Sequence, residues 1–416
     1  MRIGCMGYEF DADAQRRLTG YFSEIGRTLN NKTRRASFAT YALGLLGGAD
    51  RKSAEPIAAT ATADPVECEP AHHRLLRFLR DSPWEDGPVR RIAARYAIDA
   101  IAREEPLRTW DVDDTGFLKQ GTHSVGVQRQ YTGSAGKITN CQVAVSLSVA
   151  TRSAHVPIDF ELYLPESWTG DPVRREECRI PKDVVFRTKH DLALEMIARA
   201  VVGEVPGNIL LGDSGYGDSH GFRETVRLLG FDYALGIHAT TTMWRLDSRE
   251  RRRGQAASAR DVVRELGPKA FRRVTWREGT AGGKRGKMSS RFAFCRVKVA
   301  KDDGIDPGKH EPIWLIAEWP DGEKAATKFA LTTLKRTMSK KEIVRTFKER
   351  YRTELVYEEM KGELGLDHFE GRSFHGWNHH VTVALCCYAF VIGERMQHFP
   401  PAAGRQGRTR SLEVAA

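Results

Sequence analysis

Residues 108–117, RTWDVDDTGF, form a short β-type run that ends in acids and a glycine turn. Two further runs of strand character follow: NCQVAVSLSVA (140–150) is rich in β-branched residues, and HVPIDFELYLP (155–165) alternates like a neighbouring strand. Runs of this kind, bounded by turn residues, are typical of adjacent strands in a sheet. We therefore predict that this part of the chain folds as a β-sheet.

The segment after these strands has helical periodicity, interrupted once. Residues 189–202 (KHDLALEMIARAVV) predict an amphipathic helix, GNILLGD (207–213) predicts a compact buried strand, and residues 219–230 predict a helix that closes at a glycine. Strands followed by helix, strand and helix indicate an α/β core built in layers.

Two regions outside this core differ in composition. Residues 1–105 carry apolar positions at helical spacing, which predicts helices. The basic segment 82–102 fits either an ordinary solvated helix face or a domain that contacts DNA or dimerises. Residues 236–335 place basic and Gly/Lys-rich turns between β-type runs, which predicts a β-rich insertion into the core.

A chain of 416 residues is longer than one compact core usually serves, so several structural units are expected. We predict an N-terminal helical domain (1–105), the first part of the α/β core (106–235), a β-rich insertion (236–335), the final core helices (336–396) and a disordered tail (397–416).

The composition is that of a basic globular protein. Lys and Arg number 65 against 54 Asp and Glu, a formal net charge of +11. A basic surface attracts polyanions, and nucleic acid is the commonest of them. No apolar run reaches the roughly 18 residues of a membrane helix, and acids stand where a signal peptide would be apolar. The seven scattered cysteines fit reduced thiols, so we expect a cytoplasmic protein without a membrane partner.

Two acids follow predicted buried strands. Asp114 comes after RTWDVD and Asp213 after GNILLG, each where the strand opens into a Gly-containing turn. Side chains at strand ends project into one crevice at the sheet edge, where carboxylates can hold the two Mg²⁺ ions of phosphoryl transfer. Asp is also common in ordinary turns, so position alone leaves that alternative open.

A helix begins after Ser339, which forms a capping box with Glu342, and we predict that it runs to about Lys361. Four of its residues share one side, with spacings of three, four and seven: Phe347, Arg350, Glu354 and Lys361. Four others predict that the helix packs on the core: Val344, Tyr351, Leu355 and Tyr357. A carboxylate on the buried side between two cations suits phosphate and metal better than packing.

The spacing F-x2-R-x3-E-x6-K is similar to the Y-x2-R-x3-E-x6-K signature of bacterial insertion-sequence DDE transposases, in the subgroup with a β-strand insertion. Three further segments resemble blocks of that subgroup: DDTGFLKQGTHSVGVQRQYTGSAGKITNCQVAVSLSV, LGDSGYGD and KGELGLDHFEGRSFHGWNHH. The resemblance covers roughly residues 70 to 395. It implies an RNase H-like mixed sheet with flanking helices, two Mg²⁺ ions (Mn²⁺ as a substitute), and DNA cleavage and strand transfer.

The same resemblance assigns the catalytic and metal-binding acids. They are Asp114, with its neighbour Asp113 as the alternative, followed by Asp213 and Glu354. Cations near these acids are expected to hold DNA phosphates: Arg350 and Lys361, with Lys119 as a further candidate.

One position departs from the signature, because Phe347 replaces its tyrosine and brings no hydroxyl. Tyr351, one turn later, is a candidate substitute. The resemblance also implies that an aromatic residue of the insertion stacks on an extruded base, for which Trp276, Trp314 and Trp319 are candidates and plain strand packing is the alternative.

The function expected from this resemblance is a DNA transposase that acts, as a homodimer on DNA, on double-stranded inverted-repeat ends and on target DNA. No Gly-x4-Gly-Lys-Ser/Thr loop occurs, so ATP is not expected to take part. Two alternatives remain: a catalytically silent DNA-binding protein or repressor derived from a transposase, and a structure-selective nuclease that cannot join strands.

Overall fold

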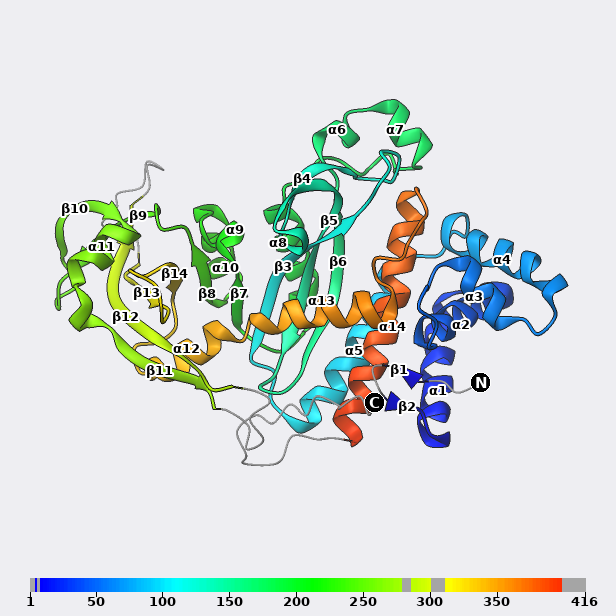
Figure 1. Cartoon of the computed structure of the whole chain (residues 1–416), viewed down its shortest axis with the longest axis horizontal. Coiled ribbons are helices and arrows are strands. Elements are labelled where there is room, and N and C mark those ends of the chain that lie inside the picture. Colours follow the sequence, from blue (N-terminus) through cyan, green and yellow to red (C-terminus); the bar gives the residue numbers. More distant parts are fainter. Residues whose placement is uncertain (1–3, 6–7, 279–285, 301–310, 399–416) are drawn as a thin grey trace. The chain divides into compact units, whose positions relative to one another are not determined.

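The computed structural model describes residues 4–5, 8–278, 286–300 and 311–398. The chain forms two compact units (Figure 1). Unit 1 comprises Met1–Leu107, Asp113–Val205 and Arg352–Ala416, and unit 2 comprises Arg108–Val112 and Pro206–Tyr351. The chain passes between the units at four points: just before strand β3, inside β3, after Val205 and at the start of helix α13. Except for residues 397 and 398, the predicted tail lies outside the described residues.

The N-terminal part of unit 1 is helical, as predicted. After two short strands, β1 (Gly4–Cys5) and β2 (Tyr8–Glu9), the helices are α1 (Ala12–Thr28), α2 (Lys32–Leu46), α3 (Ala54–Ala61), the 3-10 turn η1 (Pro65–Glu67), α4 (Cys68–Arg80) and α5 (Asp86–Glu104). Side chains start the first two helices: Asp11 accepts from the Ala14 N–H, and Asn31 accepts from Thr33. These residues supply the acceptors that the first helical turn lacks.

The remainder of unit 1 is a sheet with helices against it. The strands are the second part of β3 (Thr109–Leu118), β4 (Gln128–Thr132), β5 (Lys137–Ala150) and β6 (His155–Tyr163). Strand β5 pairs antiparallel with both β4 and β6, and its last ten residues are buried. The helices of this part are α6 (Glu166–Thr169), α7 (Pro172–Glu177), α8 (Lys189–Val202), α13 (Tyr351–Leu364) and α14 (Phe374–His398), and the 3-10 turn η2 (Gly133–Ala135) joins β4 to β5.

Helix α14 joins the N-terminal helices to this sheet, and Figure 1 shows it (orange-red) beside α5 (cyan). The buried guanidinium of Arg90 on α5 donates to Thr382 of α14 at 2.8 Å and to Asp159 of β6 at 3.0 Å. A buried charge of this kind is stable only when it is paired and hydrogen-bonded. Among the described helices, α14 included, none combines the length and hydropathy needed to cross a bilayer.

Unit 2 is built on a mixed sheet. The first part of β3, β7 (Ile209–Gly212) and β8 (Asp232–Ile237) are parallel, and β8 pairs antiparallel with β14 (Lys328–Thr332). The antiparallel series continues through β13 (Ile313–Trp319), β12 (Met288–Val299), β9 (Thr242–Leu246) and β10 (Arg252–Ser258), while β11 (Arg272–Arg277) pairs with β12. The strands of the β-rich segment therefore continue the sheet of β7 and β8.

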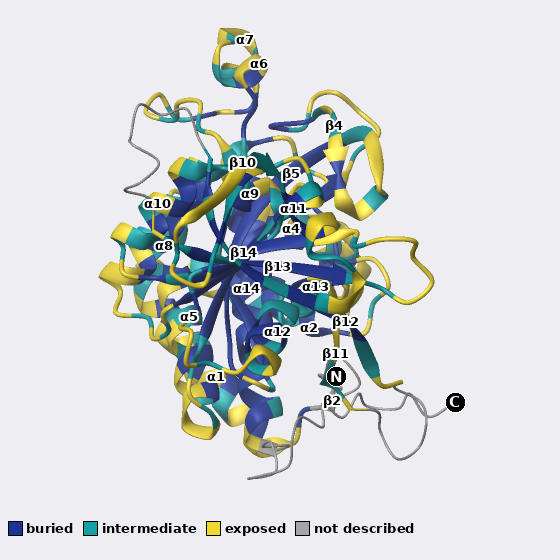
Figure 2. Ribbon diagram, turned by 90° about the vertical axis from the view of Figure 1, so that its left-hand side faces the viewer, coloured by how far each residue is buried: buried dark blue, intermediate teal, exposed yellow. Residues whose placement is uncertain are grey.

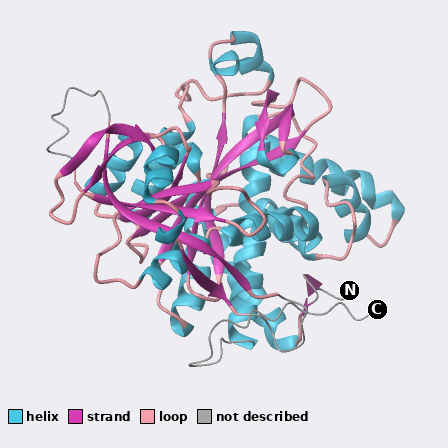
Figure 3. Ribbon diagram, turned by 60° about the vertical axis from the view of Figure 1, so that its left-hand side comes forward, coloured by secondary structure: helices cyan, strands magenta, loops and turns pink. Residues whose placement is uncertain are grey.

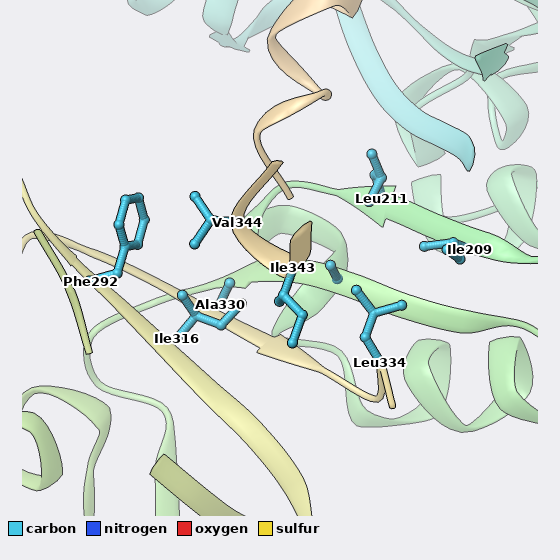
Figure 4. Close-up of a cluster of buried hydrophobic side chains, with 9 residues drawn as sticks. Ile209, Leu211, Phe292, Ile316, Ala330, Leu334, Ile343 and Val344 are labelled. Atoms are coloured by element: carbon cyan, nitrogen blue, oxygen red, sulfur yellow. The ribbon is translucent and has the colours of Figure 1, made fainter. Parts of the chain in front are cut away.

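The helices of unit 2 are α9 (Ser214–Gly217), α10 (His220–Leu228), α11 (Ala259–Leu266), the 3-10 turn η3 (Pro268–Ala270) and α12 (Lys340–Lys348). Helix α12 places Ile343 and Val344 on a cluster that includes Phe292, Ile316 and Ala330 (Figure 4). Buried residues, dark blue in Figure 2, run along β13 and β14. The predicted mixed α/β class is confirmed, with helices and strands in both units. Figure 3 shows the helices in cyan and the strands in magenta.

The prediction of one helix from Ser339 to about Lys361 was wrong. Ser339 does cap α12, accepting from the Glu342 N–H at 3.2 Å, but α12 ends at Lys348 and α13 begins at Tyr351. Packing explains the interruption, because α12 buries its apolar side in the unit 2 cluster while α13 is hydrogen-bonded to strands of unit 1. Phe347 packs against that cluster, so it does not share a helix side with Glu354.

Two buried histidines predict how the stability of unit 1 depends on pH. Burial lowers the pKa of His155 to about 3 and that of His380 to about 4. Both are neutral in the fold and titrate near 6.5 when unfolded, so stability is complete above pH 6.5 and is lost as the pH falls toward 4. We expect the free energy of unfolding to drop between pH 7 and 5 by roughly 1–2 kcal/mol per buried histidine.

Urea denaturation at the two pH values measures this loss. His155→Gln removes one titrating group and should make the drop smaller, whereas His73→Gln, at an exposed position, should leave it unchanged. Equal pH dependence in the wild type and in His155→Gln would show that this imidazole does not contribute.

Candidate active site

Unit 1 carries the adjacent acids Asp113 and Asp114 near the middle of β3. The prediction that the strand ends before Asp114 in a Gly-containing turn was wrong, because β3 continues through Gly116 to Leu118. Asp113 is buried, and its Oδ1 accepts the backbone N–H of Asp114 at 2.9 Å. The side chain of Asp114 is 27% exposed. Successive side chains of a strand point to opposite faces, so the two carboxylates have different surroundings. Of the two, Asp114 is the more accessible to a ligand.

Lys189 forms an ion pair with Asp114. Its Nζ donates to Asp114 Oδ2, and it also lies 5.8 Å from the centre of the Tyr163 ring. Lys189 is the first residue of α8, which Thr188 and Asp191 start with a capping box. Sequence reasoning missed this residue, since the only signal was its place at the start of a predicted helix. The pair shows that Asp114 attracts a cation at this position.

Lys361 and Lys119 both bind backbone carbonyls of unit 1. Lys361 Nζ donates to the Gly116 carbonyl at 2.7 Å and to Ser134 Oγ at 3.2 Å, and burial lowers its pKa. Lys119 Nζ donates to the Phe369 carbonyl at 2.6 Å. Lys361 therefore links Gly116 of β3, two residues after Asp114, to the turn between β4 and β5.

Glu354 lies in the first turn of α13 and is exposed. Its helix is fixed to the sheet by Tyr357, whose hydroxyl lies 2.6 Å from Ser146 Oγ, and by Thr353, whose hydroxyl lies 3.1 Å from His155 Nε2. The expected placement of this carboxylate on the buried side was wrong, and so was that of Leu355, which is also exposed.

The buried side of α13 consists of Thr353, Val356, Tyr357, Met360 and Leu364. Glu354 and Lys361 are seven residues apart on this helix, about two turns, and therefore lie on the same side of it. Because Thr353 and Tyr357 are hydrogen-bonded to strands, the Glu354 backbone is held while its carboxylate is open to solvent.

Asp213 is the acid of unit 2. It follows β7 directly and starts the one-turn helix α9, with Oδ1 accepting the Gly215 N–H at 2.8 Å. Gly217, the last residue of α9, lies very close to β8, because a Cβ on Gly217 would stand 1.8 Å from the Gly236 carbonyl oxygen. Only a residue without a side chain allows this approach, so two glycines set the position of the backbone that carries Asp213.

A second polar arrangement of unit 2 lies just past Asp213. Asp218 accepts the backbone N–H of His238 at 3.1 Å, is hydrogen-bonded to the Nδ1 atom of the same histidine, and accepts the Thr241 hydroxyl. These bonds fix the turn after β8, whose parallel neighbour β7 leads to Asp213. Sequence reasoning did not find this carboxylate–histidine pair, since its members are far apart in the chain.

The remaining candidates of unit 2 are Arg350, Tyr351 and Trp319, and the rings of the last two lie beside guanidinium groups. Arg350 lies in the turn between α12 and α13, and Tyr351 has the Arg277 guanidinium 5.8 Å from its ring centre. Trp319 lies under the Arg291 guanidinium at 4.2 Å, and its Nε1 donates to the Glu323 carbonyl at 2.8 Å.

Cations also cover the other two tryptophans of the β-rich segment. Lys348 Nζ is 4.8 Å from the centre of the Trp276 ring, and the Arg296 guanidinium is 5.1 Å from that of Trp314. Both rings are partly buried. Ordinary packing with cation–π contacts accounts for these contacts.

The three acids are divided between the units, with Asp114 and Glu354 in unit 1 and Asp213 in unit 2. Within the ranges that the structure describes, no group of three or more His, Cys, Asp or Glu residues is gathered as a metal site. The donors are nevertheless hard carboxylate oxygens, which suit Mg²⁺ or Mn²⁺. The Lys189 ammonium on Asp114 shows one of them already in contact with positive charge.

A mixed sheet with flanking helices and an N-terminal helical region is consistent with an RNase H-like α/β core. The chain belongs to the DDE family of endonucleases and transposases. The family described as DDE superfamily endonuclease matches residues 24–283, and the family described as transposase DDE domain matches residues 179–390.

A curated relative agrees with this assignment. A probable transposase for insertion sequence element IS701 from Microchaete diplosiphon is 27% identical over 166 residues. The matched part covers 40% of this chain and 40% of that protein. Membership of the subgroup with the Y-R-E-K signature stays a prediction.

The contact between Gly217 and Gly236 can be tested by substitution. Gly217→Ala should lower the free energy of unfolding by roughly 1–3 kcal/mol, because α9 must move away from β8. Gly221→Ala is the matched control, since a Cβ there meets nothing within 4 Å, and stability should be unchanged or slightly raised. Denaturant unfolding measures both variants, and equal stabilities would contradict the close approach.

Proposed function

We propose that this protein is a DNA transposase that cuts phosphodiester bonds at the inverted-repeat ends of a mobile element and joins the freed ends to target DNA. The observation that carries the proposal is the arrangement of β3 and β7, in a chain that belongs to the DDE family. These strands are parallel neighbours, with Asp111 opposite Leu211. Asp213 follows Leu211 by two residues, and Asp113 and Asp114 follow Asp111 by two and three.

Asp113 and Asp213 each stand two residues beyond the last paired positions of β3 and β7, which supports one shared crevice. The carboxyl ends of neighbouring parallel strands meet at the same edge of a sheet, where ligands of open α/β sheets bind. We infer that Asp114 and Asp213 approach each other at this edge and that Glu354, from α13, completes the set. Together they would hold two divalent ions, which when bound supply positive charge to the reacting phosphate.

The cations of the site hold DNA in this proposal. The ammonium of Lys361 has three N–H donors, two of which serve Gly116 and Ser134, and the third is available to a phosphate oxygen. Arg350 lies in the turn that leads to α13 and can bind a phosphate with its planar group. Hydrolysis leaves a 3′-hydroxyl, and in a transposase this hydroxyl then attacks target DNA.

The partners follow from this chemistry. Double-stranded DNA is the substrate at both steps, and joining two ends requires at least two copies of the chain on the DNA. We propose a homodimer on DNA that works without ATP in the cytoplasm, beside the nucleoid. A protein that bound the ends without cutting them would be a silent derivative, and one that cut without joining would be a nuclease only.

Substitution of the three acids tests the proposal. With Mg²⁺ or Mn²⁺, the wild type should nick duplexes that carry the inverted repeats bordering its gene. Asp114→Asn, Asp213→Asn and Glu354→Gln should each lower nicking by roughly 10³-fold or more, because each removes a charged oxygen ligand of the metal ions, yet keep DNA binding.

Glu358→Gln is the matched control, because Glu358 is exposed and lies one turn after Glu354 on the same helix. It should nick at the wild-type rate. Normal nicking by Glu354→Gln would overturn the assignment of this carboxylate, and nicking without joined products would identify a nuclease.

Lys189 gives a second test, independent of catalysis. Its ammonium is ion-paired with the Asp114 carboxylate, so we expect it to compete with an added metal ion for that carboxylate. Lys189→Met should lower the Mn²⁺ concentration at which thermal stabilisation is half complete, roughly three- to tenfold for an ion pair near the surface. Lys182→Met removes the same charge at an exposed position seven residues earlier in the chain and should cause little change. Equal midpoints for the two variants would show that the pair does not compete with metal.

A further inference from the structure

The hairpin of β4 and β5 exposes two large apolar side chains that face the same way. Tyr131 and Ile138 are direct cross-strand partners, and they are 63% and 61% exposed. Cross-strand partners lie on one face of a sheet, so the ring and the aliphatic chain form one continuous apolar surface. We call this pair the hairpin face.

The hairpin is fixed to the strand that carries Asp114. Ser134, in the turn η2, places its Oγ 3.3 Å from the Gly116 N–H and 3.2 Å from Lys361 Nζ. Thr132 packs so closely on Gly116 that a Cβ there would stand 2.0 Å from its hydroxyl oxygen. The turn η2 is therefore held beside Gly116, two residues after Asp114 in the chain. Tyr131 precedes Thr132 on β4, so the hairpin face is the opposite, solvent-exposed face of this anchored hairpin.

The charge around the hairpin face favours nucleic acid. Residues 128–138, QRQYTGSAGKI, include exposed Arg129 and Lys137 and contain no Asp or Glu. Arg129 precedes Tyr131 by two residues and so points to the same face of β4. A cation beside an exposed aromatic ring is the combination that binds a backbone phosphate and stacks on its base.

We propose that the hairpin face contacts DNA bases beside the scissile phosphate, with Tyr131 stacked on one base and Ile138 wedged against the next. This inference rests on the proposed function, because it takes the substrate of Asp114 to be DNA. A second copy of this chain is the less suitable occupant, since two side chains fall far short of the roughly 800 Å² per partner of a stable interface. Sequence-tolerant stacking also fits a site that meets both element ends and target DNA.

The test places 2-aminopurine at each position flanking the cleavage site of an inverted-repeat duplex. The protein carries Asp114→Asn, so that binding is followed without cutting. The complex should change the fluorescence at one flanking position, because that base leaves its stack for the Tyr131 ring. Adding Tyr131→Ala should abolish the change, and Tyr131→Phe, which keeps the ring, should preserve it.

Nicking by otherwise wild-type protein gives the second readout. Tyr131→Ala and Ile138→Ser should slow it roughly tenfold, in line with the loss of one base stack. Val202→Ser is the control, because Val202 is an 84% exposed apolar residue of the same unit, and it should have no effect.

The failures of the two proposals are distinguishable. If the wild type did not nick the DNA but the fluorescence change was still observed, the proposed catalysis would be overturned and the hairpin contact would be supported. An unchanged fluorescence response and nicking rate in Tyr131→Ala would overturn the hairpin inference alone. It would also be overturned if that variant altered only the sedimentation of DNA-free protein, which would identify the face as a protein interface.

Discussion

Carboxylates that share a crevice repel one another unless positive charge lies between them, and this requirement governs the chemistry proposed for the protein. The described structure already meets it in part. Asp114 is paired with the Lys189 ammonium, and Asp213 accepts a backbone N–H at the start of α9. Glu354 is exposed to water. Asp114 and Asp213 are therefore each in contact with a hydrogen-bond donor that carries full or partial positive charge.

Hydrogen bonds and close packing hold the backbone segments that carry Glu354 and Asp213 in place. Tyr357 and Thr353 tie α13 to the sheet of unit 1, and Gly217 lets α9 approach β8 in unit 2. Rigid supports of this kind let a small number of side chains act at defined positions. The three acids belong to two units of the chain, with Asp114 and Glu354 in one and Asp213 in the other.

Much of the fold could be predicted from the sequence, because its signals are local. The β-type runs at 140–150 and 155–165 became β5 and β6, and the segment 189–202 became α8 with matching bounds. The break between α12 and α13 could not be predicted, since it arises from packing on two different units. The exposure of Glu354 was missed for a different reason, because helical spacing does not say which side of a helix meets a sheet.

The acids of the candidate site were predicted from a signature, and their shared role stays a prediction. The sequence could not show how the surroundings of Asp113 and Asp114 differ, whereas in the structure Asp113 is buried and accepts the Asp114 N–H. Lys189 and the Asp218–His238 pair depend on contacts between segments far apart in the chain, and spacing carries no trace of these.

The central claim is that Asp114, Asp213 and Glu354 bind the same pair of ions. Anomalous diffraction from a Mn²⁺-loaded complex with inverted-repeat DNA tests it most directly. We predict two manganese peaks about 3.5–4 Å apart, with carboxylate oxygens of all three residues among their ligands at about 2.0–2.3 Å. Peaks bound by other residues, or acids too far apart to share an ion pair in the DNA complex, would contradict the account.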